Sequence, residues 1–409
     1  MNAATEFLRR RVVPPLTALS ENTYLSAIRA GMVSVVPLTI IGGLFMVVAF
    51  LPVAGWDKFV APWQPLLQAP VTATFGLLAV FVCFAIGYDL GKRLGQEAIV
   101  SATMATLVFL LLAIEPKGEA LAMERLGSKG LFTAILVALV AVRVQEFFTD
   151  RDLVIKLPAG VPRVVYESFL SLVPLVALVI AFWLLRFVLG VDLDAFVSAA
   201  FRPLVFALNT LPGILVYAFL VTLLWSVGIN GDNALDAIVA PIFLQFLAAN
   251  VAAMAAGQPL PYVTANGFFS TFVNVGGTGA TLALALVLCR SRDAGFRQVS
   301  RLSLPTQGFQ INEPIFFGLP IGLNPIFMVP FVLNALLLTT ATYLLMDWHV
   351  IQRPFVNIPW TTPPIVGHYL ATGGDWRAAV WGATSILLAM AVYYPFAKAA
   401  ERQRPSAAK

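Results

Sequence analysis

The stretch QINEPIFFGLP, residues 310–320, contains a single charged side chain, Glu313, among apolar and uncharged neighbours. The nearest charged residues in the sequence are Arg301 and Asp347. A carboxylate at the centre of a membrane helix costs about 2.5–3.5 kcal/mol to insert. Glu313 is therefore expected to face a cavity or a polar partner, unless it lies at a loop end and caps a helix.

The chemistry of an isolated carboxylate leaves two functions open for Glu313. An ionised carboxylate accepts several hydrogen bonds, often in pairs, which suits the hydroxyl groups of a sugar. A buried carboxylate can alternatively bind and release a proton.

The composition around this stretch is that of a membrane protein. The chain has 409 residues, of which 59% are hydrophobic and 11% are charged, and its mean hydropathy is +0.86. A soluble domain carries about 25% charged residues. An all-α polytopic membrane fold is therefore expected, because apolar runs of about 18 residues or more can each cross the bilayer. The candidate spans before the first break, at residue 228, cover residues 30–53, 72–91, 99–114, 130–147, 169–189 and 211–228.

The second half differs from the first, and the division falls near residue 200. Between residues 228 and 374 the apolar runs are short and are interrupted by Gly, Pro and Asn, as in GINGDN (228–233) and GGTG (276–279). Non-helical backbone at membrane depth is tolerated only inside protein or beside a wet cavity. Interrupted segments of this kind indicate the substrate site of a transporter, although any single interruption can also be an ordinary loop.

Basic residues predict an orientation in which both termini are cytoplasmic. Arg9–Arg11, Lys92 with Arg93, and the arginines at 290, 292, 297 and 301 fall at alternate ends of the spans. Lys and Arg accumulate in cytoplasmic loops, so the net charge of +5 is read as membrane topology and not as nucleic-acid binding. The first apolar run is too long for a cleaved signal, so it is expected to remain in the protein.

A second polar cluster follows the first break of the second half. Asn230 and Asp232 offer donors and acceptors that match hydroxyl groups, and Gly231 allows a close approach of backbone. Asp232 or Asn233 can equally be the N-cap of an apolar helix that begins at Ala234, and the two functions are compatible.

Two tryptophans and one histidine are further candidates for the site. Trp225 and Trp360 can stack on the face of a pyranose ring, or anchor the chain at the membrane interface. His368 is interpreted as structural.

Several classes of function lack their sequence signals. Cys83 and Cys289 are isolated, and only two histidines are present, so neither a disulfide framework nor a metal site is predicted. There is no phosphate-binding loop or dinucleotide fingerprint. No cofactor and no ATP-driven transport are expected in this chain.

The sequence around Glu313 resembles a known family. The stretch LPTQGFQINEPIFFGLPIGLNP (304–325) is similar to the signature of the EIIC membrane subunits of the phosphoenolpyruvate-dependent sugar phosphotransferase system, in the lactose/cellobiose (diacetylchitobiose) branch. Further similar stretches run the length of the chain, at residues 22–32, 157–162, 272–279, 359–374 and 393–396.

The resemblance implies an architecture and a set of partners. It implies about ten membrane helices plus two re-entrant hairpins in the bacterial inner membrane. It assigns residues 1–200 to a dimerisation half and residues 201–409 to a sugar-binding half that moves as a rigid body. It also implies that a separate EIIB protein, itself served by EIIA, phosphorylates the 6-hydroxyl of the sugar during delivery, and that Glu313 contacts the sugar.

One departure from the family pattern concerns the phosphorylation step. The family usually has His in a Gly-Ile-His-Gly sequence, where this chain has Asn230 in GING (228–231). Asn does not titrate near neutral pH, although it can hydrogen-bond a hydroxyl. No residue is therefore assigned as catalytic, and whether the chain counts as part of an enzyme stays open, because the phosphoryl chemistry would belong to EIIB.

The leading hypothesis is an EIIC sugar permease for a β-linked disaccharide. Glu313 and Asn230 would bind the sugar, assisted by Asn312, Asp232, Gly231, Trp360 and the backbone around Gly276 and Gly277. The alternative is a facilitator or a proton-coupled carrier that is uncoupled from phosphotransfer. A membrane sugar sensor without net transport is the third hypothesis.

Overall fold

The computed structural model describes residues 21–50, 55–115, 120–155, 157, 158, 166, 169–319, 321, 322 and 324–403. Arg9–Arg11, residues 51–53 of the first predicted span, most of the polar segment 156–165 and Pro320 lie outside the described residues. Within the described ranges the regular elements are helices, and the one pairing of extended backbone joins Ile114 to Leu121. The predicted all-α class is confirmed.

The first half forms a bundle of apolar helices around α7, α8 and α10. Small residues allow these helices to approach closely: a side chain at Gly87 of α7 would lie 3.0 Å from the Cα atom of Ala102 on α8. The helices of this half are α3 (Thr23–Ser34), α4 (Val36–Ala49), α5 (Trp56–Val60), α6 (Gln64–Phe75), α7 (Leu78–Arg93), α8 (Ala98–Ala113), α9 (Met123–Leu126), η2 (Ser128–Gly130), α10 (Leu131–Asp150), α12 (Leu172–Trp183), η3 (Leu184–Val188) and α13 (Leu193–Leu208).

The second half alternates three long helices with short ones, as its broken sequence predicts. The long helices supply the framework, and the short ones surround the breaks at residues 264–280 and 309–324. The helices of this half are α14 (Leu211–Ser226), α15 (Gly231–Ala255), η4 (Phe268–Val273), α16 (Thr281–Leu288), α17 (Ala294–Gly308), α18 (Glu313–Gly318), α19 (Pro325–Asp347), α20 (Pro364–Ala371) and α21 (Trp376–Gln403).

The described helices give fewer candidate spans than the ten that the resemblance implies. Six helical stretches of the described chain are long and apolar enough to cross a membrane, or seven if α12 with η3 and α13, bent by 86°, are one span. The predicted spans 99–114 and 211–228 correspond to α8 and α14, apolar helices too short to count among the six. The polytopic membrane fold is confirmed, whereas ten spans and two re-entrant hairpins stay a prediction.

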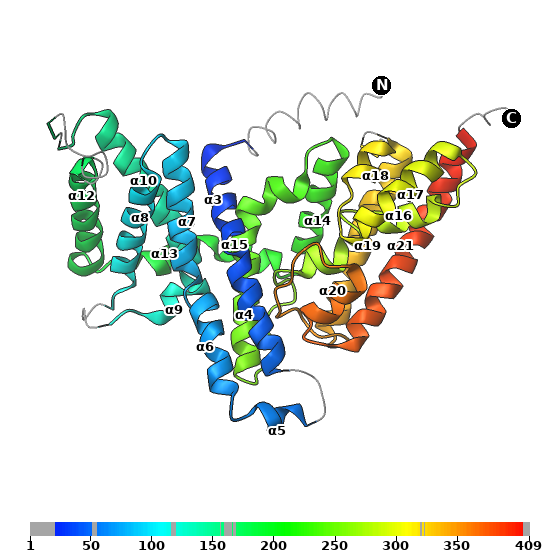
Figure 1. Ribbon diagram of the computed structural model, residues 1–409, viewed down its shortest axis with the longest axis horizontal. Coiled ribbons are helices and arrows are strands. Elements are labelled where there is room, and N and C mark those ends of the chain that lie inside the picture. Colours follow the sequence, from blue (N-terminus) through cyan, green and yellow to red (C-terminus); the bar gives the residue numbers. More distant parts are fainter. Residues whose placement is uncertain are drawn as a thin grey trace.

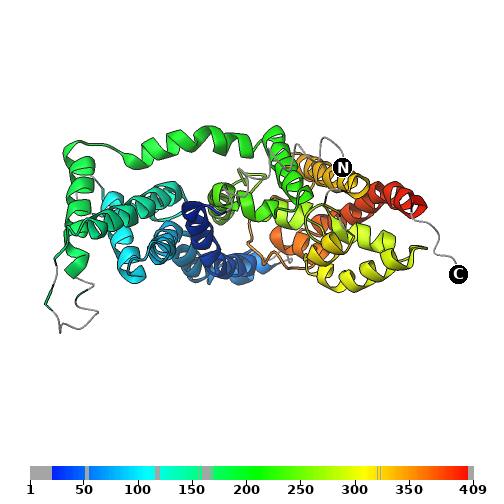
Figure 2. The same ribbon diagram turned by 90° about the horizontal axis from the view of Figure 1, so that it is seen from above.

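The molecule is elongated, with the two halves side by side (Figures 1 and 2). Helices α7, α8, α10 and α12 lie toward one end, α16–α21 lie toward the other, and α3, α4 and α15 lie between them. Helix α13, which contains the predicted boundary at residue 200, runs along one edge between α12 and α14 (Figure 2). The start of α3 and the ends of α7 and α21 lie on the same side (Figure 1).

Buried amide groups join the two halves. Asn357 donates a hydrogen bond of 2.6 Å to the Thr39 hydroxyl on α4, and its own amide oxygen accepts one of 3.0 Å from Asn266. Gly43, one turn beyond Thr39, allows this close approach, because a Cβ atom at position 43 would lie 3.1 Å from the backbone nitrogen of Asn357. The broken segments of the second half are thereby packed directly on α4.

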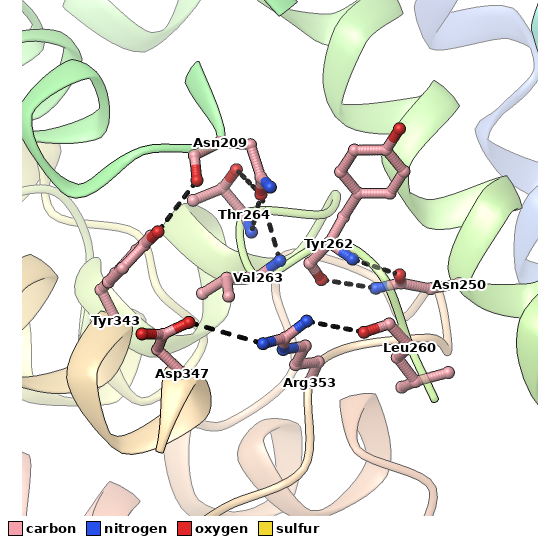
Figure 3. A network of polar contacts seen from close by, with 9 residues as sticks. All are labelled: Asn209, Asn250, Leu260, Tyr262, Val263, Thr264, Tyr343, Asp347 and Arg353. Atoms are coloured by element: carbon pink, nitrogen blue, oxygen red, sulfur yellow. Dashed lines mark hydrogen bonds and ion pairs between the residues drawn. The ribbon is translucent and has the colours of Figure 1, made fainter. Parts of the chain in front are cut away.

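A second polar network holds the segment that leads into η4 (Figure 3). The buried Asn250 side chain of α15 donates to the carbonyl oxygens of Tyr262 and Pro354, each at 2.8 Å, and accepts from the Tyr262 N–H at 2.9 Å. Arg353 lies between the Leu260 carbonyl oxygen and the Asp347 carboxylate. One asparagine thus satisfies three backbone groups of two irregular segments.

We expect Asn250→Leu to destabilise the protein strongly. The substitution keeps the number and branching of the side-chain heavy atoms but leaves three backbone groups without their hydrogen-bond partner, and each orphaned group costs about 1–3 kcal/mol. The thermal unfolding midpoint of the detergent-purified protein should fall by several degrees. Thr384→Val, on the exposed face of α21, is the control and should leave it unchanged. Equal midpoints for the two variants would contradict this role of Asn250.

Candidate sugar-binding cavity

A cavity of about 410 Å³ lies where the breaks of the second half meet α3 and α4 of the first. The start of α15 forms one wall, the segments around η4 and α18 form others, and residues of α3, α4 and the chain after α19 close it. The lining residues are Val33, Val36, Tyr217, Trp225, Asn230, Asp232, Asn233, Asp236, Phe243, Thr264, Ala265, Asn266, Gly267, Phe268, Phe269, Ser270, Asn274, Gly277, Thr278, Gln310, Asn312, Glu313, Asn357, Ile358 and Trp360.

Asn230 is the N-cap of α15. Its side-chain oxygen accepts a hydrogen bond of 2.9 Å from the Asn233 N–H, and the helix begins at Gly231. The predicted N-cap at Asp232 or Asn233 is therefore wrong, because the helix starts three residues earlier than its apolar pattern indicated. Gly231 does not line the cavity. It allows α15 to approach the backbone of α14 closely, because a Cβ atom at position 231 would lie 2.1 Å from the Val221 carbonyl oxygen.

The Asp232 carboxylate organises one wall of the cavity. It accepts hydrogen bonds from the Trp225 indole N–H at 2.8 Å, the Asn274 amide at 3.1 Å and the Thr278 hydroxyl at 2.6 Å. These donors come from α14 and from the segment after η4, so one carboxylate joins three parts of the chain. Three accepted bonds hold the Asp232 side chain in one orientation.

Glu313 lies at the first position of α18, and its side chain is exposed at the cavity. No hydrogen bond or ion pair engages its carboxylate within the described residues. Asn312 precedes it and makes no capping bond; its amide instead donates to the Thr278 carbonyl oxygen at 3.1 Å. Glu313 therefore presents its carboxylate oxygens to the cavity, whereas Asp232 is already occupied by protein donors.

Two glycines let the cavity walls approach each other. The Gln310 side-chain oxygen accepts from the N–H groups of Gly276, at 2.6 Å, and Gly277, at 3.4 Å. Gly277 has φ = +102°, and a side chain there would lie 2.5 Å from the Cβ atom of Asn312. Gly277 lines the cavity, but Gly276 is buried behind it, against Leu282.

Both tryptophan candidates line the cavity, but they differ in exposure. Trp225 is buried and contacts Phe316 edge to face at 5.1 Å between ring centres, so it is not an interfacial anchor. Trp360 is exposed. His368 is fully buried against Phe272 and does not line the cavity.

Sequence reasoning missed several lining residues. Asn274, Thr278 and Gln310 lie inside stretches on which the resemblance rests, so their positions carried a signal that was not used. Asp236 lies one helical turn after Asp232 and follows from the position of Asn230 at the start of α15. Asn266 and Asn357, whose side chains meet at 3.0 Å, had no local signal, because they come from segments 91 residues apart.

The chemistry of the lining suits a neutral ligand rich in hydroxyl groups. The lining contains three carboxylates (Asp232, Asp236 and Glu313), six Asn, one Gln and two Trp, and no Lys, Arg or His. The three carboxylates disfavour an anionic ligand, and no cationic side chain of the lining offers it a charge-assisted hydrogen bond. Among the described residues, no group of three or more His, Cys, Asp or Glu is arranged to hold a metal ion. Amides and carboxylates match hydroxyl donors and acceptors, and an aromatic face can cover the apolar face of a ring.

Comparison with known proteins places the chain in a family. Residues 29–335 match the family model described as "Phosphotransferase system, EIIC". The chain is 36% identical to the putative permease IIC component YwbA of Bacillus subtilis, covering 99% of this chain and 97% of that protein. It is 34% identical to the cellobiose-specific EIIC component of Geobacillus stearothermophilus, covering 99% and 96%.

A solved structure extends the similarity to the fold. The transporter ChbC, the IIC component from the N,N'-diacetylchitobiose-specific phosphotransferase system, superposes with a TM-score of 0.92 at 31% identity. The similarity covers 97% of this chain and 98% of ChbC. The chain is a polytopic membrane protein that belongs to the EIIC family of the phosphotransferase system.

Proposed function

We propose that this protein carries a β-linked disaccharide across the bacterial inner membrane and that a separate EIIB protein phosphorylates the sugar during delivery. The observation that carries the proposal is the cavity lining, which combines three carboxylates and seven amide side chains with no cation. Such a set binds a neutral, hydroxyl-rich molecule. Two of the similar proteins are named for cellobiose and for diacetylchitobiose, which are both β-linked disaccharides.

Within this proposal Glu313 is the principal sugar ligand. Its carboxylate is free of protein donors within the described structure and can accept hydrogen bonds from two adjacent hydroxyls. Trp360 supplies an aromatic face, while Asn230 and Asn312 supply amide groups. Asp232 acts mainly by holding Trp225, Asn274 and Thr278 in place, and Gly276 and Gly231 act through backbone packing.

The orientation proposed for the chain puts both termini and the EIIB partner in the cytoplasm. The end of α7 with Lys92 and Arg93 and the end of α21 with Arg402 lie on the same side of the molecule (Figure 1). Helix α18 with Glu313 lies toward this side as well. The cavity would then be accessible to a cytoplasmic phosphoryl donor.

The proposal assigns different tasks to the two halves. Residues 1–200 would form a homodimer in the lipid bilayer, and residues 201–409 would carry the sugar. Thr39 and Asn357 lie at the contact between the halves, where movement of one half against the other would break and remake hydrogen bonds.

A facilitator or proton-coupled carrier is the second candidate, and a specific observation favours it. Asn230 stands where the family usually has His, its side-chain oxygen is engaged in capping α15, and no His lines the cavity. The chain therefore offers no neutral imidazole to take the proton of the reacting hydroxyl. In this alternative Glu313 or Asp232 would exchange protons.

Uptake of labelled cellobiose by membrane vesicles separates these candidates. We expect phosphorylated sugar inside the vesicles only when phosphoenolpyruvate, the general phosphotransfer proteins and cognate EIIA and EIIB are supplied. Accumulation of unmodified cellobiose driven by a proton gradient would support the second candidate. Saturable binding without flux would identify a sensor.

We expect Glu313→Gln to weaken equilibrium binding of cellobiose by roughly 10- to 150-fold, because hydrogen bonds to a charged group contribute about 1.5–3 kcal/mol. Isothermal titration of the purified protein measures this loss. Glu97→Gln, at the start of α8 and outside the cavity, is the matched control and should bind normally. Unchanged affinity in Glu313→Gln would remove Glu313 from the site.

We expect Asn230→His to make phosphorylation depend on pH near the usual pKa of His, about 6.5. The neutral imidazole can accept the hydroxyl proton, so the rate in the variant should rise as the pH increases through this value. The natural protein should show no such step from this position. Formation of sugar phosphate from phospho-EIIB between pH 5.5 and 8 provides the measurement. Identical pH profiles would exclude residue 230 from the phosphorylation step.

A further inference from the structure

A second cavity, of about 730 Å³, lies between the two halves, at the ends of α4 and α15 and the start of α21. In Figure 1 helix α5 and the start of α21 lie away from the side on which α3 begins and α21 ends. We call this space the outer cavity; it is lined by Ala49, Phe50, Trp56, Val60, Gln64, Met254, Gln352, Phe355, Thr372, Gly373, Gly374, Asp375, Trp376 and Arg377.

The outer cavity combines aromatic rings with uncharged hydrogen-bonding groups, as the first cavity does. Trp56 comes from the first half and Trp376 from the second, and Trp376 is 69% exposed. The indole N–H of Trp56 is bonded to the Val48 carbonyl oxygen at 2.8 Å, which fixes its ring. Gln64 and Gln352 add amide groups from opposite halves. These groups match the alternating apolar and hydroxyl faces of a sugar.

The two charged residues of the lining, Asp375 and Arg377, form an ion pair with each other. Asp375 accepts from Arg377 Nε at 2.9 Å and Nη2 at 3.0 Å, and from the Gln352 N–H at 2.8 Å. The Asp375 side chain is only 8% exposed, whereas the Arg377 side chain is 49% exposed. A bidentate pair of this kind leaves no net charge for an ionic ligand, yet the guanidinium has further N–H groups that can donate to hydroxyl oxygens.

One extended segment connects the outer cavity to the sugar cavity. Gln352 and Phe355 line the outer cavity, and Asn357 and Trp360 line the other. Asn357 lies five positions after Gln352, a distance of at most roughly 18 Å. A path between the two cavities would therefore run along this segment.

A small apolar cluster includes two residues of this segment. Leu260, Phe355 and Val356 are buried together, with Val47 and Met254 packed against them. The N–H groups of Phe355 and Val356 both donate to the Ala371 carbonyl oxygen, which attaches the extended segment to α20. The cluster adjoins both linings, because Phe355 and Met254 line the outer cavity and Ile358, which packs against the cluster, lines the other.

We propose that the outer cavity is a second carbohydrate-binding site, at which the disaccharide binds before it passes the Leu260–Phe355–Val356 cluster. The inference rests on the proposed transport of a sugar and adds a site to it. Residues of both halves line the outer cavity, so bound sugar would contact the two parts whose relative movement opens the path.

Uptake kinetics test the outer site. We expect Trp376→Ala and Gln64→Ala to raise the KM for uptake of labelled cellobiose about fivefold or more, the effect of truncating a contact residue at a binding site, with the maximal rate retained. Trp376→Phe keeps an aromatic ring and should restore most of the lost affinity. Trp63→Ala is the matched control, because Trp63 is exposed, adjoins Gln64 and does not line the cavity.

An equilibrium measurement gives an independent result. In the natural protein we expect two cellobiose-binding events. Trp376→Ala should remove the weaker event and leave the Glu313-dependent one unchanged, whereas Glu313→Gln should weaken only the Glu313-dependent one. A single binding event in the natural protein, or an unchanged KM in Trp376→Ala, would overturn the outer site. A lower maximal rate with unchanged KM would show that Trp376 only anchors the protein in the bilayer.

Transport by the natural protein and the behaviour of the outer-cavity variants separate the two proposals. If the natural protein neither binds nor transports cellobiose or diacetylchitobiose, the proposed function fails. If it transports one of them and the outer-cavity variants behave like Trp63→Ala, only the outer site fails.

Discussion

The structure depends on the hydrogen bonds that satisfy its broken backbone in an apolar surrounding. A bilayer offers no water to unpaired N–H and C=O groups, so each interruption needs polar partners from the protein itself. Gln310 accepts from the N–H groups of Gly276 and Gly277, Asn312 donates to the Thr278 carbonyl oxygen, and Asn250 engages three backbone groups. Buried amide side chains thus satisfy much of the irregular backbone of the second half.

This constraint explains why the sugar cavity lies among the breaks. Residues recruited to satisfy irregular backbone bring amide and hydroxyl groups to one place, and groups not consumed in this way remain available to a ligand. Asp232 and Glu313 illustrate the difference. Asp232 accepts from Trp225, Asn274 and Thr278, whereas Glu313 begins a short helix and faces the cavity without a partner in the described structure.

The contact between the halves adjoins both cavities. The proposed sugar cavity and the outer cavity are each lined by residues of the two halves, and the segment around Phe355 contributes to both linings. The hydrogen bond between Thr39 and Asn357 lies beside this segment. A displacement of the second half would change both cavities together, which is the coupling that alternating access across a membrane requires.

The sequence by itself determined the membrane class and the contrast between long apolar runs and interrupted ones, and it singled out Glu313 as an isolated carboxylate. These features are local: hydropathy is a property of single helices, and an isolated carboxylate in an apolar run is visible without any partner. The resemblance of residues 304–325 to the EIIC signature added the family, which the comparisons confirmed.

Only the tertiary structure decided which residues meet. The N-cap at Asn230 instead of Asp232, the exclusion of Gly231 and Gly276 from the lining, and the pairing of Asn266 with Asn357 depend on contacts between distant segments. Hydrogen-bond partners separated by 91 residues leave no periodic pattern in the sequence, because the fold, and not the spacing, brings them together. The outer cavity has the same origin, since each half supplies only part of its lining.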